Sequence, residues 1–166
     1  MTNEEMKDTG IPENMTAEQE YDLLEGLLAA ADYVNELKPI RIERNGKHMF
    51  TFHVHAVSEK DKMDAHRKAT TYAKNPAGAH LPQIEKDTPP ELFKSWLIFI
   101  ATSDEDKQNI WNNKELKKQL NVLRGVETID LLLKAGEKDA VMDVIAELSG
   151  FGIGSNSITT DEFAKN

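Results

Sequence analysis

The chain of 166 residues contains no cysteine. A disulfide-linked scaffold, a thiolate zinc site and a cysteine nucleophile are therefore all excluded. The absence also fits a protein of a reducing compartment, where disulfide bonds are rare.

Long hydrophobic runs are lacking as well. The longest, Trp96 to Ala101, is far below the roughly 20 apolar residues that a helix needs to span a bilayer. The first ten residues, MTNEEMKDTG, are polar and acidic, so we expect no signal peptide and no membrane partner. Hydrophobic residues make up 39% of the chain, so we expect a core with part of the chain outside it.

Basic residues are scarce at the N-terminal end. Residues 1–38 hold ten acidic residues and two basic ones, whereas residues 39–88 hold nine basic and six acidic residues. The formal net charge of the chain is −9. Binding to phosphate backbones needs a strong basic patch, so this distribution argues against nucleic acid as the main partner.

The acidic arm, residues 1–37, contains one helical pattern. Residues 1–14 show no periodicity, and we expect them to be disordered. Thr16 and Gln19 have the spacing of a capping box, which predicts the start of a helix. Apolar residues then recur at helical spacing and predict an amphipathic helix over about 16–34 that packs on the body or docks another subunit. They are Tyr21, Leu24, Leu28 and Ala31.

A β-hairpin is expected next, over about 39–57. Apolar and polar residues alternate in 39–44 and again in 48–57. Asn45-Gly46 lies between them and suits the positive φ angles of a type I′ turn. A lone hairpin is marginally stable in water, so its apolar face must pack on helices or on another subunit.

The rest of the chain predicts helices, which gives an α+β, mainly α fold: one hairpin packed on a bundle of about five to six helices, with flexible termini. Capping and proline signals place helix starts at Ser58, Pro89-Pro90, Ser103 and Asn113. The Ser58 helix is expected to run to about Ala73, followed by a loop over 75–88. Further helices follow Gly125 and Gly136, Gly150 suits a C-terminal cap, and 152–166 is expected to be a flexible tail.

Three histidines are the strongest candidates for metal chemistry. His53 and His55 point to the same face of a strand, and His66 could complete a ligand set with nearby carboxylates. The competing interpretation, which we favour, is two histidines on the solvated face of the hairpin, because no recognised metal motif is present.

Other candidate catalytic features have simpler explanations. The carboxylates of 104–106 and of Glu137 and Asp139 lie at helix starts, where acidic groups stabilise the helix dipole. Gly150, Gly152 and Gly154 follow a predicted helix rather than a strand, so the context of a phosphate-binding loop is missing. We therefore predict no enzyme activity, no catalytic residue, no metal and no cofactor.

Three residues are the candidate protein-binding positions. Leu24 and Leu28 lie on the apolar face of the predicted N-terminal helix. Trp111 is expected at an interface, where tryptophan is enriched, whereas Trp96 is expected to anchor the core.

Several short pieces follow one another along the chain over residues 38–151. They are Phe50–Val54, Arg67–Tyr72, Ser95–Ile98, Ala101-Thr102, Ile110–Glu115, Leu120–Val122, Gly125–Asp130, Ala135–Lys138 and Glu147–Phe151. In this order they resemble the tail assembly chaperones of contractile-tailed phages and of PBSX-like defective prophages of Gram-positive bacteria.

The resemblance implies a role in tail assembly. Such a protein would bind the tape measure protein, keep it soluble and help recruit tail tube subunits, and self-association is expected. It would act in the cytoplasm of the bacterial host and be absent from the mature virion. The alternatives are a structural tail or baseplate component retained in the virion and a metal-dependent enzyme built on His53, His55 and His66.

Overall fold

A computed structural model describes residues 16–151, which fall into two compact units. One unit ends at Asn35 and the other begins at Glu36. The expectations of a disordered stretch over 1–14 and of a flexible tail over 152–166 concern segments outside the described residues. The separate arm and chaperone domains, with their boundary at residue 37, stay predictions.

The predicted N-terminal helix is confirmed as α1, Ala17–Val34. The Thr16 hydroxyl accepts a hydrogen bond from the Gln19 amide, and the Gln19 side chain accepts one from the Thr16 amide, so the capping box is complete. These bonds satisfy amide groups that have no partner within the helix. Within its own unit, α1 is the one element among the described residues.

The second unit begins with the predicted hairpin, formed by β1 (Lys38–Arg44) and β2 (Lys47–Val54). Asn45 and Gly46 have φ angles of 53° and 73°, which confirms the turn expected from this dipeptide. The register pairs Ile40 with Phe52 and Ile42 with Phe50 and shifts between Ile42 and Glu43. The isoleucines and phenylalanines therefore share one face, and that face packs into the core.

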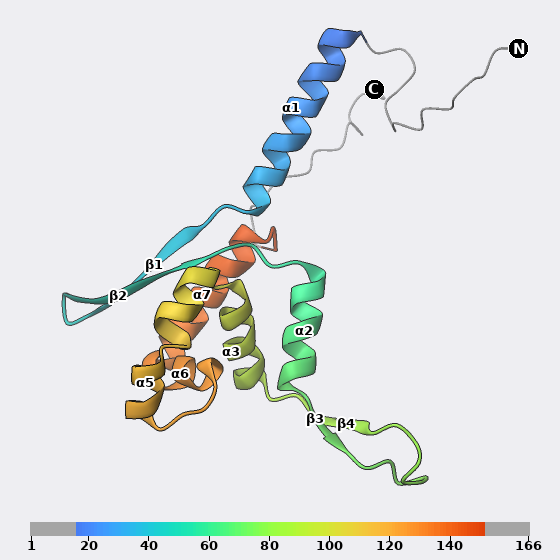
Figure 1. The fold of residues 1–166 in the computed structure, drawn as a ribbon, viewed down its shortest axis with the longest axis vertical. Coiled ribbons are helices and arrows are strands. Elements are labelled where there is room, and N and C mark those ends of the chain that lie inside the picture. The colour runs from blue at the N-terminus through green and yellow to red at the C-terminus, as the bar shows by residue number, and fades with distance from the viewer. Residues whose placement is uncertain (1–15, 152–166) are drawn as a thin grey trace, which may run out of the picture. The chain divides into compact units, whose positions relative to one another are not determined.

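The C-terminal half of the bundle follows a long central helix, α3 (Pro90–Ala101). The end of β2 bonds to the end of this helix, because the His55 amide donates to the Ala101 carbonyl and Val54 bridges Thr102. Figure 1 shows α3 between α2 (Glu59–Ala69) and α7 (Ala135–Leu148). The elements after α3 are α4 (Asp104–Asp106), the π-helical turn η1 (Lys107–Trp111), α5 (Lys114–Leu120), α6 (Gly125–Leu132) and α7 (Ala135–Leu148).

The region after the first hairpin differs from the prediction. Helix α2 (Glu59–Ala69) begins at Ser58 with the expected capping box, but it ends four residues before Ala73. Strands β3 (Thr71–Ala73) and β4 (Ile84–Asp87) then form a second antiparallel hairpin where a loop was expected. The Thr70 hydroxyl donates to the His66 carbonyl and bonds Thr88, and the β-branched and aromatic residues that follow favour a strand.

The end of α7 has the predicted glycine cap. Gly150 has a φ angle of 81°, a left-handed conformation that favours glycine. The amides of Gly150 and Phe151 donate to the carbonyls of Glu147 and Ala146, which is the pattern of a Schellman motif. With the first hairpin and the helices, the structure confirms an α+β, mainly α fold. None of the helices within residues 16–151 is long and apolar enough to cross a membrane.

Trp111 is more deeply buried than expected, whereas Trp96 packs against the core but is only partly buried. Trp111, predicted at an interface, has 0% of its surface exposed, and its indole Nε1 donates to the Thr102 hydroxyl at 2.9 Å. Its ring packs edge-on against Phe52 and Phe50, with centroid distances of 5.1 and 6.1 Å. Trp96, predicted in the core, is half-buried beneath the Lys68 ammonium group. This burial removes Trp111 from the candidate binding surface.

We predict that Trp111→Ala lowers the free energy of unfolding by about 3–5 kcal/mol, because it leaves a cavity and removes the hydrogen bond that the Thr102 hydroxyl accepts from the indole. Trp96→Ala should cost clearly less, since that ring is half-buried. Urea unfolding followed by circular dichroism would measure both values. Equal losses for the two variants would contradict the assignment of Trp111 as the core anchor.

Candidate protein-binding surface

The apolar face of α1 is exposed. Leu24 and Leu28, both predicted binding residues, have 54% and 59% of their surfaces exposed. Seven of the sixteen large hydrophobic side chains exposed among the described residues lie in α1. They are Tyr21, Leu23, Leu24, Leu27, Leu28, Tyr33 and Val34. Such a concentration of exposed apolar side chains is typical of a surface that binds another protein.

The seam of this surface, called here the α1 stripe, consists of Tyr21, Leu24, Leu28 and Ala31. Their spacing of three, four and three residues places them on one face of the helix. The stability of a helix in a protein comes mostly from the packing of its amphipathic face rather than from its own hydrogen bonds. A partner that covers the α1 stripe would therefore stabilise the helix.

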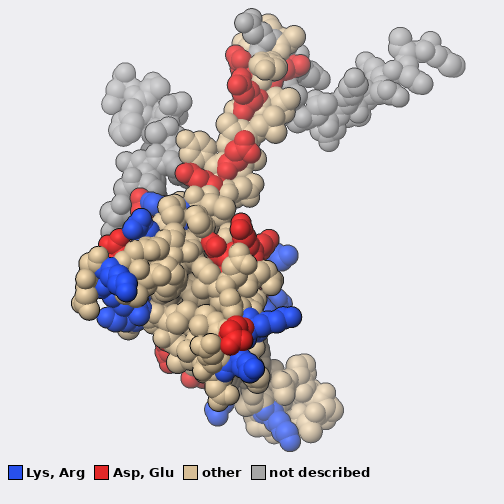
Figure 2. All heavy atoms as spheres, turned by 60° about the vertical axis from the view of Figure 1, so that its left-hand side comes forward, with Lys and Arg blue, Asp and Glu red and all other residues tan. Residues whose placement is uncertain are grey.

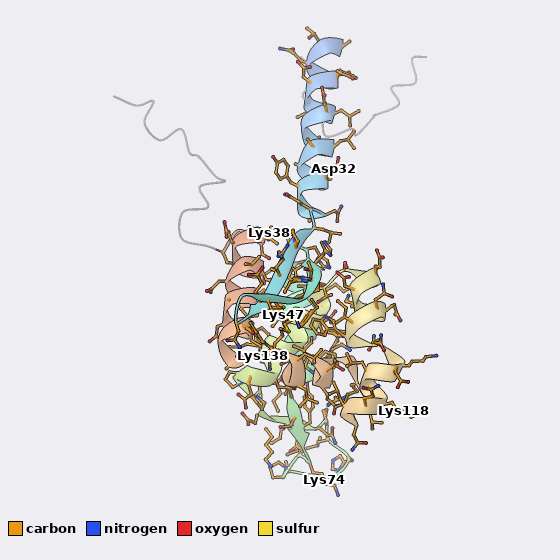
Figure 3. All side chains as sticks on the ribbon, turned by 90° about the vertical axis from the view of Figure 1, so that its left-hand side faces the viewer. Asp32, Lys38, Lys47, Lys74, Lys118 and Lys138 are labelled. Carbon is orange, nitrogen blue, oxygen red and sulfur yellow. The ribbon has the colours of Figure 1, made fainter. Side chains whose placement is uncertain are left out.

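Acidic side chains border the α1 stripe. Figure 2 shows Asp and Glu along α1, and no Lys or Arg lies between Ala17 and Val34. Glu25 and Asp32 line the same shallow groove as Tyr21, Leu24 and Leu28. Figure 3 shows Asp32 near the C-terminal end of the helix. The surface therefore combines apolar contact area with negative charge.

The three candidate metal ligands have separate partners. The His53 ring lies 2.9 Å from the Asp106 carboxylate, measured from Nδ1 to Oδ2. The His55 Nδ1 lies 2.8 Å from the Ala56 carbonyl oxygen, and the His66 ring is adjacent to the Thr70 hydroxyl. Within residues 16–151, no group of three or more histidine, aspartate or glutamate side chains is arranged to hold a metal ion.

Asp106, the last residue of α4, has a structural position. Burial raises the pKa of its carboxyl group, but hydrogen bonds from the His53 ring, the His53 amide and the Ser103 hydroxyl together outweigh this effect. The pKa of Asp106 therefore lies below its usual value, and the carboxylate stays ionised. Because it accepts bonds from β2 and from Ser103, it joins the hairpin to the start of this helix.

Two further charged groups join elements of the second unit, and the sequence pattern did not reveal either. Arg44 at the end of β1 donates to both carboxylate oxygens of Glu137 in α7, at 3.0 and 2.8 Å. The hydrogen bond from Arg44 lowers the pKa of Glu137. In the other group, Lys138 of α7 contacts Ser95 of α3 and Asp130 of α6. In each group, side chains from different elements meet, so only the tertiary fold brings the members together.

A second groove lies between α2 and the β3–β4 hairpin, with a volume of about 660 Å³. Its apolar lining comes from Met63, Tyr72 and Phe93, and its rim carries both acidic and basic side chains. The sequence analysis missed it, because it depends on the β3–β4 hairpin that was expected to be a loop. Mixed charges at the rim give this groove no clear preference for a charged partner.

A mainly helical fold with an exposed apolar stripe is typical of the class of proteins that bind other proteins. A family model described as Phage XkdN-like tail assembly chaperone protein matches residues 4–163, and the chain belongs to this family. The match confirms the resemblance and extends it from residues 38–151 to include α1. Searches of curated proteins and of solved structures each gave no match.

Three lowered carboxyl pKa values predict acid destabilisation. Hydrogen bonds lower the pKa of Glu127 (from the Arg124 and Leu123 amides) and of Glu137 (from Arg44) below 4.5, and Asp106 lies below 3.8. The unfolded chain therefore binds protons before the folded chain does as the pH falls. We expect the free energy of unfolding to fall progressively once the pH drops below about 4.5.

Urea unfolding between pH 7 and pH 3 would measure this dependence. Glu137→Gln should be less stable than the wild type at pH 7 and should lose less stability on acidification. Glu147→Gln, at an exposed position of α7, is the control and should follow the wild-type curve. An unchanged acid dependence in Glu137→Gln would contradict the role given to the Arg44–Glu137 pair.

Proposed function

We propose that this member of the tail assembly chaperone family binds the tape measure protein, keeps it soluble and helps recruit tail tube subunits. A tail assembly chaperone is a non-enzymatic kind of protein. The observation that carries the proposal is the exposed α1 stripe, which offers an apolar face to a helical client. The acidic side chains beside it would keep the complex hydrated and soluble.

The proposal includes self-association around the client. The outer edge of β1 has no strand beside it among the described residues, so it offers unpaired backbone groups to a second copy. In this scheme the chaperone works in the cytoplasm of the host and leaves before the virion is complete.

The solubility of the client tests the role of the α1 stripe. Co-expression with the tape measure protein of the same phage or prophage should keep that client in the soluble fraction. Leu24→Ser/Leu28→Ser should abolish this effect, because both changes replace exposed apolar contacts with polar groups. The soluble amount of client, measured after centrifugation, is the readout.

Leu123→Ser/Leu131→Ser is the matched control. These leucines are also exposed, but they lie after α5 and in α6. The control should keep the client soluble and should fold as the wild type does. The proposed role of the stripe would be contradicted if the client stayed insoluble with the wild type. An equal loss of soluble client in both variants would contradict it as well.

The alternative is a structural component retained in the tail or baseplate. Mass spectrometry of purified virions separates the two roles, because a retained component is present in a fixed number of copies per particle. We expect the chain to be absent from virions and present in the lysate of infected cells. Abundant copies in the virion would overturn the chaperone proposal in favour of the structural role.

A further inference from the structure

The charges along the edges of the α1 stripe restrict which partner can bind it. Glu25 and Asp32 each follow a stripe residue directly, and they are seven residues apart, so they lie along the same edge. Glu20 directly precedes Tyr21 and lies along the opposite edge. Both edges therefore carry carboxylates, and no basic side chain of α1 offsets them.

A second copy of α1 is a poor partner for this face. In a parallel helix pair, the edge with Glu25 faces the edge with Glu20 of the other copy. In an antiparallel pair, the edge with Glu25 and Asp32 faces the same edge of the other copy. Either orientation opposes carboxylates across an apolar seam, and like charges placed together disfavour association.

We propose that the α1 stripe selects an amphipathic helix whose apolar face is flanked by Lys or Arg. Leu24 and Leu28 supply the apolar contact, and Glu25 and Asp32 pair with the basic flank of the partner. This inference rests on the proposed function, in that it assigns a chemical class to the client segment bound by the same site. It also assigns self-association to a surface other than α1, such as the β1 edge.

Model peptides test this selection on the full chain. Two peptides of about three heptads would carry identical apolar residues, with Lys at the flanking positions of one and Glu at those of the other. Fluorescence anisotropy should show that the Lys peptide binds at least about tenfold more tightly. Its affinity should fall as salt increases, because screening weakens exposed ion pairs.

A charge-reversal variant provides the stricter test. Glu25→Lys/Asp32→Lys should weaken binding of the Lys peptide and strengthen binding of the Glu peptide. Asp143→Lys/Glu147→Lys changes the net charge equally at two exposed positions of α7, and it should leave both affinities unchanged. A similar effect from both variants would mean that net charge, and not the edge of the α1 stripe, controls binding.

Three results overturn the inference. One is equal binding of the two peptides, and another is a failure of the Lys peptide to bind the wild type. The third is a dimer in light scattering that Leu24→Ser/Leu28→Ser dissociates, because a second copy would then cover the stripe. If the Lys peptide binds selectively but the tape measure protein stays insoluble, the inference survives and the proposed function fails.

Discussion

The burial of one indole ring determines how the second unit packs. Trp111 is the largest fully buried side chain among the described residues, and it contacts three elements at once. Its Nε1 bonds Thr102 at the end of α3, its ring packs on Phe52 of β2, and it ends η1. The start of α6 packs closely on the same region: a Cβ at Gly125 would lie 2.4 Å from Asn112 Oδ1, 2.8 Å from the Phe99 ring and 3.1 Å from the Trp111 carbonyl oxygen. A larger residue at this position would have to displace those neighbours.

The apolar face of the first hairpin is buried in this core. Ile42, Phe52 and Val54 are buried against helices, so that face is not available to a partner. The elements are then joined by polar contacts such as Arg44 with Glu137 and Asp106 with His53. Apolar binding surface consequently concentrates in α1, whose own unit contains no other described element. Packing and the proposed binding of a partner would therefore use different segments of the chain.

Local signals in the sequence predicted local structure well. The capping boxes at Thr16 and Ser58, the Asn45-Gly46 turn and the Gly150 cap each depend on a few neighbouring residues, and all four are present. The early end of α2 was missed, because the Thr70 hydroxyl bonds both the last turn and Thr88, a residue that only the fold brings near. Trp111 was misplaced for a similar reason: its burial depends on which elements meet, and periodicity alone does not contain that information. Leu24 and Leu28 were correctly expected on the apolar face of α1 because their spacing is regular within one helix, and their role in binding stays a prediction.

A marginal helix with one apolar face and no basic residue is well suited to reversible binding. Each exposed leucine of the α1 stripe that becomes buried contributes about 1–2 kcal/mol at most, and part of that gain offsets the ordering of the helix itself. The apolar contacts alone would thus give moderate affinity for many amphipathic helices. The carboxylates of Glu25 and Asp32 add little net energy when exposed, but they penalise acidic partners and speed the approach of basic ones. Affinity and selectivity would then come from different side chains of one helix, which lets a chaperone hold its client and still release it.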